Sequence, residues 1–206
     1  VAANGLVPVY CWAHARRAFV EALKALGLDP NKLPAKPPDK ARRPLKALAF
    51  IRHLYAIEAR VRDRPPDERQ MRRQTESVPV LNDCRAWLDR LLPMVVPGSP
   101  LGKALGYLDR HWSGLVRYGE DGRLEIDNNR CENAIRPFVT GRKNWLFSDT
   151  VHGARSSANL YSLIETAKAN GLAPYPYLRR VFTELPRATT VADIEALLPW
   201  ASPTDG

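Results

Sequence analysis

Cysteine is scarce in this sequence, and long apolar runs are missing altogether. The three cysteines, Cys11, Cys84 and Cys131, are widely spaced and odd in number, which argues against a disulfide framework and favours a reducing compartment. No run of about 18 apolar residues occurs, so no helix is expected to span a membrane. Residues 1–5 lack the basic segment and apolar stretch of a signal peptide. We therefore expect a cytoplasmic protein without a membrane partner.

Motifs of several common enzyme classes are also missing. The sequence has neither of the phosphate-binding patterns Gly-x-x-x-x-Gly-Lys and Gly-x-Gly-x-x-Gly, and no Gly-x-Ser-x-Gly turn. Nothing therefore indicates nucleotide hydrolysis. Cys11 and His14 have the Cys-x-x-His spacing of some zinc sites, but a structural zinc needs four ligands and no matching second pair exists. We interpret His14 as a residue at the start of a helix.

The residues that are present are typical of a globular protein with an excess of positive charge. The 206 residues are 45% hydrophobic and 26% charged, which suits one ordinary domain with or without a small appendage. Lysine and arginine number 31 against 22 aspartates and glutamates, for a net charge of +9. Such a balance favours a polyanionic partner such as nucleic acid.

The basic residues are densest between Arg42 and Arg73, where ten lysines and arginines stand against four acids. One interpretation is a solvent-exposed helix face on which Glu58 pairs with Arg62 one turn later. The other is a positive stripe that follows the phosphates of DNA. The sequence pattern leaves both open.

Hydrophobic periodicity predicts a mostly α-helical chain with a few short strands. The apolar run 6–11 predicts a buried strand, and apolar residues at every third or fourth position then predict a helix over 12–26 that stops at Gly27. Prolines at 29–39 predict a linker. Three more helices are predicted within 45–117, with a kink at Pro79.

The second half of the chain carries further helix signals. Segment 124–127 is predicted to be a strand or an extended lead-in, and Asp127–Asn129 predict the start of a helix that Pro137 disrupts. A basic turn is predicted at 141–144. Beside it, Trp145 and Phe147 suit either core packing or stacking on unpaired bases. The last helices are predicted at about 156–170, 177–185 and 191–200.

Glu132 is an acidic residue in a basic setting. It lies one turn into a predicted helix, and the nearby basic residues are Arg130, Arg136, Arg142 and Lys143. A glutamate in the first turn commonly stabilises the helix dipole by about 0.3–1 kcal/mol, and spacing alone favours this role. A carboxylate among cations also suits a Mg²⁺ ligand that works beside phosphate oxygens.

Four blocks of the sequence occur in a recognisable order. They are Cys11–Arg17, Asp127–Pro137, Gly141–Phe147 and Tyr161–Gly171. The last three resemble the C-terminal part of the IS66 family of insertion-sequence transposases, and the first resembles a motif that lies further upstream in the same family. Together the blocks span nearly the whole chain.

The resemblance implies the C-terminal part of an RNase H-like α/β core of a DDE transposase, in which two aspartates and one glutamate hold two divalent cations, Mg²⁺ or Mn²⁺. Glu132 would then be the third acid, both a catalytic residue and a metal ligand. The implied domains are a partial catalytic domain at 1–171, with a helical insertion at about 41–118, and a helical extension at 172–206. The implied DNA-binding residues are Arg16, Arg17, Arg130, Arg136, Arg142 and Lys143.

In the family both aspartates lie upstream of the Cys-Trp-Ala-His motif, and the ten residues before Cys11 contain no acid. The chain is therefore expected to be a transposase truncated at its N-terminus, unable by itself to cleave or join the ends of the element and its target DNA. The full-length protein is expected to be a homo-oligomer. Two other roles stay open: a non-catalytic fragment that binds DNA or modulates transposition, and a decayed product without a role.

Overall fold

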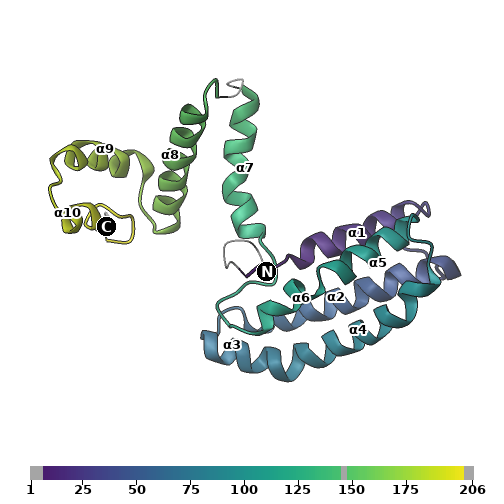
Figure 1. Ribbon diagram of the computed structural model, residues 1–206. Helices are drawn as coiled ribbons and strands as arrows, with labels where there is room; N and C mark the ends of the chain where they lie inside the picture. The colour runs from purple at the N-terminus through teal and green to yellow at the C-terminus, as the bar shows by residue number, and fades with distance from the viewer. Residues whose placement is uncertain (1–6, 145–147, 202–206) are drawn as a thin grey trace. The chain divides into compact units, whose positions relative to one another are not determined.

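The computed structural model describes residues 7–144 and 148–201, and every regular element within them is a helix (Figure 1). The first α-helices are α1 (Trp12–Lys24), α2 (Arg42–Val61), α3 (Pro66–Arg72), α4 (Val78–Leu91), α5 (Pro100–Arg110) and α6 (Trp112–Val116). They are followed by α7 (Asn129–Asn144), α8 (Val151–Ala169), α9 (Pro174–Glu184) and α10 (Val191–Glu195). A π-helix, η2 (Arg73–Ser77), joins α3 to α4, and short 3-10 helices cover Asp39–Ala41, Leu92–Met94, Arg117–Gly119 and Leu185–Arg187.

The expected RNase H-like α/β fold with a few short strands is wrong, because the described residues contain no strand. Residues 7–10, expected in a buried strand, are exposed and irregular. Their backbone bonds to a helix and not to another strand: the Tyr10 N–H donates to the carbonyl of Gly114 in α6 at 3.0 Å. Residues 124–127 form no strand either. A short strand is stable only when its backbone hydrogen-bonds to neighbouring strands, and neither segment has such a neighbour among the described residues. The other apolar residues recur at helical spacing and form helices.

The chain divides into two compact units, residues 1–130 and 131–206, and each is described by itself. The first contains α1 to α6 and the first residues of α7, and the second contains the rest of α7 with α8, α9 and α10. The expected domain boundary after residue 171 and the expected insertion at about 41–118 stay predictions.

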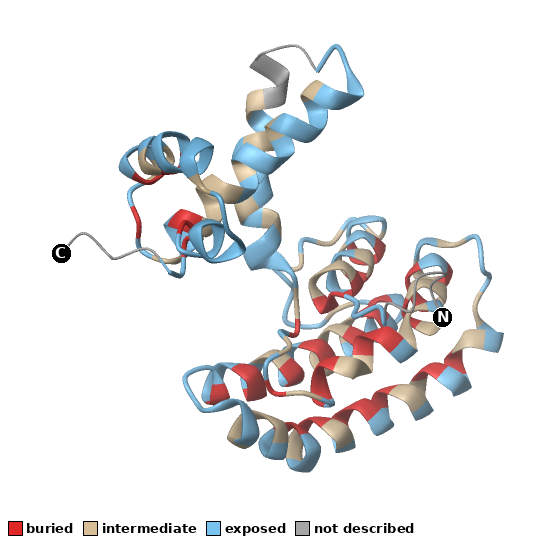
Figure 2. Cartoon of the chain, turned by 60° about the vertical axis from the view of Figure 1, so that its left-hand side comes forward, coloured by how far each residue is buried: buried red, intermediate tan, exposed pale blue. Residues whose placement is uncertain are grey.

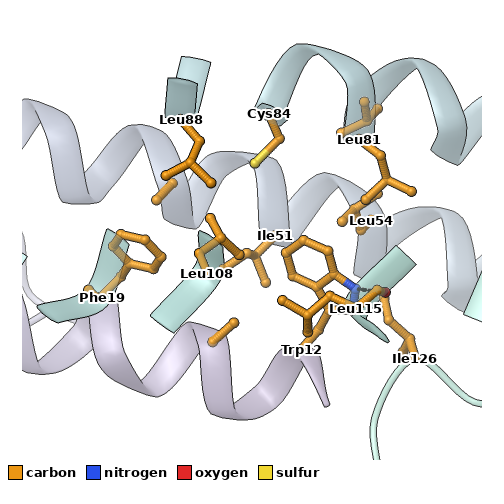
Figure 3. Packing of buried hydrophobic residues seen from close by; sticks show 14 of the residues in the cluster. Trp12, Phe19, Ile51, Leu54, Leu81, Cys84, Leu88, Leu108, Leu115 and Ile126 are labelled. Carbon is orange, nitrogen blue, oxygen red and sulfur yellow. Dashed lines mark hydrogen bonds between the residues drawn. The ribbon is translucent and has the colours of Figure 1, made fainter. Parts of the chain in front are cut away.

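The core of the first unit lies between α1, α2, α4 and α5. α1 packs against α2 and α5, and α2 packs against α4. Each helix turns one apolar stripe inward, so that Phe19, Leu54, Leu88 and Leu108 meet in one cluster (Figure 3). Trp12 is fully buried at the start of α1, and its indole Nε1 donates to the carbonyl of Leu115 at 2.8 Å. The helix predicted from residue 12 is thereby confirmed.

Helix ends follow several of the predicted stop and start signals. Gly27 and Gly171 both have φ of 76°, a left-handed conformation that closes α1 and α8 and that only glycine adopts at little cost. Thr190 and Asp193 form a capping box at the start of α10. α10 itself ends at Glu195 and is shorter than the helix predicted to reach residue 200.

The helical path departs from a regular α-helix just before Pro79, where a kink is predicted. Pro79 occupies the second position of α4, where a missing N–H costs no hydrogen bond within the helix. The π-helix η2 directly precedes this turn and places Arg73 and Ser77 in the interior, both with no exposed surface. A wider helical turn therefore accompanies the entry of a charged side chain into the core.

The core of the second unit is smaller. Its buried members are Ala167, Leu172, Tyr177, Val181 and Leu197, and the Tyr177 hydroxyl donates to the carbonyl of Leu197 at 3.0 Å. Figure 2 shows that buried residues are sparse in this unit and frequent in the first. Most of the side chains of α7 and α8 are therefore exposed or half-buried.

α7 is longer than predicted, because Pro137 does not end it. The helix continues to Asn144, so the predicted disruption and the predicted basic turn at 141–144 are wrong. A proline inside a helix removes one hydrogen bond and crowds a carbonyl, at a cost of about 3 kcal/mol. Beyond it, the ring of Phe138 packs edge-on against Tyr161 of α8 with 4.9 Å between ring centroids. This contact helps to hold the helix past the proline.

Gly122 lies so close to the start of α3 that even a methyl group should destabilise the first unit. A Cβ at this position would lie 1.8 Å from the carbonyl oxygen of Pro66. We expect Gly122→Ala to lower the free energy of unfolding in urea by about 1–3 kcal/mol. Gly98→Ala is the control, since its Cβ would meet no atom within 4 Å. Equal urea midpoints for the two variants would contradict the close approach.

Candidate functional site

The start of α7 is held by the side chain of Asp127. Its carboxylate accepts a hydrogen bond from the Asn129 N–H at 3.0 Å, one from the Asn129 side-chain amide at 3.0 Å and one from the Tyr55 hydroxyl of α2 at 2.8 Å. The first N–H groups of a helix lack partners within it, and aspartate satisfies them well. Asp127 therefore fixes the start of α7, and the start predicted at 127–129 is confirmed.

Tyr55 is the partner that ties this carboxylate to α2. Burial of the phenol raises the pKa of Tyr55 above its ordinary value, and the hydrogen bond to Asp127 and its negative charge raise it further. The positive charge of Arg16 opposes part of this rise. Tyr55 therefore stays protonated at neutral pH and donates to Asp127, and this carboxylate serves the structure of the helix start.

Glu132 lies in the first turn of α7 and is half-buried. At about 100° per residue, it shares one face of the helix with Ile135 and Val139, while Ala134 and Phe138 lie on the opposite face. The side chains of Ile135 and Val139 are 51% and 44% exposed. A carboxylate beside two exposed apolar side chains is typical of a face that contacts another molecule or another part of a longer protein.

The arginines expected to contact DNA are exposed wherever their side chains are described. Arg16 and Arg17 lie on α1, and Arg130 and Arg136 lie on α7. None of the four forms an ion pair or a hydrogen bond with another described residue. The backbones of Arg142 and Lys143 belong to α7, but their side chains lie outside the described part of the chain, as do Trp145 and Phe147.

A cavity of about 620 Å³ lies in the first unit between α1 and α2. Arg16, Arg52, Tyr55 and Asn129 form its polar lining, and no aspartate or glutamate lines it. The remaining lining is apolar and comes from α1, from α2 and from Pro30 and Leu33 of the segment between them. The cavity thus combines two arginines with a mainly apolar wall.

Much of the basic block between residues 42 and 73 is paired inside the protein. The expected pair of Glu58 with Arg62 is wrong, because Glu58 faces inward and receives the guanidinium of the fully buried Arg73 at 2.6 and 2.8 Å. The other ion pairs of this block are Arg42–Asp39, Arg60–Glu76, Arg64–Glu68, Arg72–Glu76 and those of Arg69 with Glu125 and Glu58. The block therefore offers DNA fewer free cations than its composition indicates.

Two family profiles match this chain. The profile described as Transposase IS66 family matches residues 1–156, and the profile described as IS66 C-terminal element matches residues 162–200. The chain belongs to the IS66 transposase family. The resemblance carried by the four sequence blocks is thereby confirmed.

Three curated relatives of this IS66 family chain come from Sinorhizobium fredii (strain NBRC 101917 / NGR234). Uncharacterized protein y4jD is 35% identical over 192 residues, which cover 93% of this chain and 35% of the relative. Uncharacterized protein y4hP is 31% identical over 205 residues, 97% of this chain and 36% of the relative. Uncharacterized protein y4qI is 30% identical over 190 residues, 92% of this chain and 33% of the relative. The chain thus spans about a third of the length of these relatives, and no solved structure matches it.

The IS66 chain does not contain a complete metal site in its described residues. No group of three or more His, Cys, Asp or Glu side chains lies close enough there to hold an ion. Cys11, Cys84 and Cys131 all belong to the described residues and are free thiols. None of the helices described is both long and apolar enough to cross a bilayer.

The predicted site residues did not include Arg52 and Tyr55, although both line the cavity of this family member. Their sequence signal is the spacing of Leu45, Leu48, Arg52 and Tyr55, which puts the four on one face of α2. Whether such a face lies on a cavity depends on how α1 and the residues near Leu33 pack beside it. Periodicity within one helix does not contain that information.

Proposed function

We propose that this chain is part of an IS66-type transposase that cuts and joins DNA strands, with Glu132 as one of its metal-binding acids. The match of the family profile over residues 1–156, which include Glu132, carries the proposal. The position of Glu132 is compatible with it, since a half-buried carboxylate on a helix face with exposed apolar neighbours suits a site completed by another part of the protein.

The proposed reaction consists of two displacements at phosphorus. Water first attacks a phosphodiester at the end of the element and releases a DNA 3′-hydroxyl. That hydroxyl then attacks a phosphodiester of the target, forms a new phosphodiester bond and displaces the 3′-hydroxyl of the target strand. Two divalent ions, when bound, would activate the attacking oxygen and stabilise the leaving oxygen. Glu132 would supply a carboxylate ligand, and the other two acids would come from the part of the protein that the family places before Cys11.

The exposed arginines would position the DNA for this reaction. Arg16, Arg17, Arg130 and Arg136 have no ion-pair partner among the described residues. Phosphate contacts of this kind fix the position and orientation of DNA without reading its sequence. The proposed partner of the chain is therefore DNA, with its backbone held by arginine.

The experiment that tests this function is cleavage of DNA that carries the ends of the element. A longer polypeptide, in which the two family aspartates precede these 206 residues, should cut it with Mg²⁺ or Mn²⁺ and fail to cut it in EDTA. A polypeptide of the 206 residues alone should not cut, because it contains one acid of the triad. Cleavage by the 206 residues alone, or cleavage that persists in EDTA, would overturn the proposal.

A second candidate function is DNA binding without catalysis, and the unpaired exposed arginines favour it. Neutralising four phosphates should give a slope of about −3 to −4 in a plot of log K against log salt, at about −0.9 for each phosphate. Fluorescence anisotropy of a labelled duplex measures this slope for the 206-residue chain. Replacing Arg16 and Arg17 together by alanine should make the slope less negative by about 2. An absence of binding at low salt would rule this function out.

A further inference from the structure

The cavity between α1 and α2 has an apolar wall beside its two arginines, and contacts with phosphates alone would leave that wall unused. Its volume of about 620 Å³ falls within the range of roughly 300–1,000 Å³ that is common for small-ligand sites. We propose that it binds one unpaired nucleotide of a DNA strand, with the phosphate held by Arg16 and Arg52 and the base against the apolar wall. This inference rests on the proposed function only in taking DNA as the partner.

The charge of the cavity favours an anion. Arg16 comes from α1 and Arg52 from α2, and neither forms an ion pair with a described residue. No carboxylate lines the cavity to neutralise them. Asp127 lies behind Tyr55, and its carboxylate is already bonded to the Tyr55 hydroxyl and to Asn129. Two arginines that line the same cavity are well suited to a phosphate, since each guanidinium can donate two parallel hydrogen bonds to it.

The apolar wall favours an unpaired base over a paired one. Leu45 and Leu48 of α2 line the cavity, and Leu33 lies at its edge with 38% of its surface exposed. The flat faces of a base are its most apolar surfaces, and in a duplex they are covered by the neighbouring bases. A duplex could therefore place phosphates near Arg16 and Arg52 but would leave the leucines in water. A base that has left the stack can cover them, and this removes apolar surface of both the base and the leucines from water.

The proposal is tested by comparing two DNA ligands on the 206-residue chain. One is a blunt duplex, and the other is the same duplex with three unpaired nucleotides at one end. We expect the overhang to bind about tenfold more tightly, because the base covers the apolar wall that a duplex leaves in water. Fluorescence anisotropy at fixed salt gives both affinities, and their ratio is the quantity of interest because non-specific phosphate contacts contribute to both.

Substitutions in the cavity should remove this preference and leave duplex binding in place. Ala49→Phe fills the cavity from α2, and Leu33→Asp places a negative charge at its edge; each should bring the ratio close to one. The matched controls are Ala59→Phe, on an exposed part of the same helix, and Asn31→Asp, in the same loop but outside the cavity lining. Both controls should keep the wild-type ratio. Circular dichroism shows whether each variant is folded. Leu33→Asp changes a half-exposed loop position, so the test stays valid even if Ala49→Phe does not fold.

Substitution of the arginines tests the proposal independently. Arg52→Ala should weaken binding of the overhang more than binding of the blunt duplex, whereas Arg43→Ala, an exposed arginine at the start of the same helix that does not line the cavity, should weaken both equally. A wild-type ratio near one, or a ratio unchanged by Leu33→Asp and Arg52→Ala, would overturn the nucleotide site while duplex binding stands. An absence of binding to either DNA would overturn the site together with DNA as the partner.

Discussion

Arg73→Leu is expected to destabilise the first unit by about 3–5 kcal/mol, because it removes all the hydrogen bonds of a buried guanidinium and leaves the buried carboxylate of Glu58 with Arg69 alone, 3.8 Å away. Arg73 has no exposed surface, and its guanidinium donates to both oxygens of Glu58 and to the carbonyls of Tyr118 and Asp121 at 2.7 and 3.0 Å. These bonds join α2, η2 and the loop after α6. Removing the guanidinium therefore breaks the connection of three segments and leaves Glu58 with only the more distant Arg69 as an ion-pair partner.

The neighbouring Arg72→Leu is the matched control for this effect. Arg72 is 52% exposed and pairs with Glu76 at the surface, and such pairs contribute about 1 kcal/mol at most. Unfolding in urea, followed through tryptophan fluorescence, measures both variants; three of the five tryptophans, Trp12, Trp87 and Trp112, belong to the first unit. The double variant Arg73→Leu with Glu58→Leu should recover much of the lost stability, since replacing a buried ion pair by apolar side chains is often neutral. A urea midpoint for Arg73→Leu equal to that of Arg72→Leu would show that the buried pair contributes nothing.

The sequence predicts the helices of the first unit well, because the signals that make them are local. The apolar spacing from Trp12, the glycine at 27 and the prolines that follow each act within a few residues. The partner of Glu58 is not local. The sequence predicts that Glu58 pairs with Arg62, one turn away. In the structure Glu58 pairs instead with Arg73, which enters the core from the π-helix. A choice between two arginines depends on which face of α2 is covered, and one helix considered alone cannot show that.

The strand predicted at 6–11 is not formed by residues 7–11, the part of it that the structure describes, and the reason is related. Val7 and Val9 have the branched side chains of a strand, but a strand needs a neighbour with free backbone groups, and the described residues offer none. Glu132, by contrast, could be singled out from sequence because its motif is contiguous. The cavity of Arg16 and Arg52 could not, since its two arginines are brought together only by the packing of α1 on α2.

The proposed function predicts that Glu132→Gln, in a longer polypeptide that also carries the two family aspartates, reduces DNA cleavage at least about a thousandfold. A metal ion stabilises the charge of the transition state by several kcal/mol, and about 4 kcal/mol corresponds to a factor of about a thousand in rate. Glutamine keeps the length of the side chain and removes the negative charge that a divalent ion requires. Cleavage is measured from the rate at which the element's ends are nicked under single-turnover conditions.

Two comparisons separate loss of a metal ligand from loss of structure. Glu184→Gln removes the charge of an exposed residue on α9 that pairs with Arg180, and it should cleave within about twofold of wild type because a surface pair contributes little. Glu132→Gln should bind the DNA ends as tightly as the parent protein, since the proposed function assigns the phosphates to the arginines and not to the acid. Full cleavage by Glu132→Gln would mean that another residue supplies the third acid. Loss of binding together with cleavage would instead assign Glu132 to the positioning of α7, so the pair of measurements decides which role the carboxylate has.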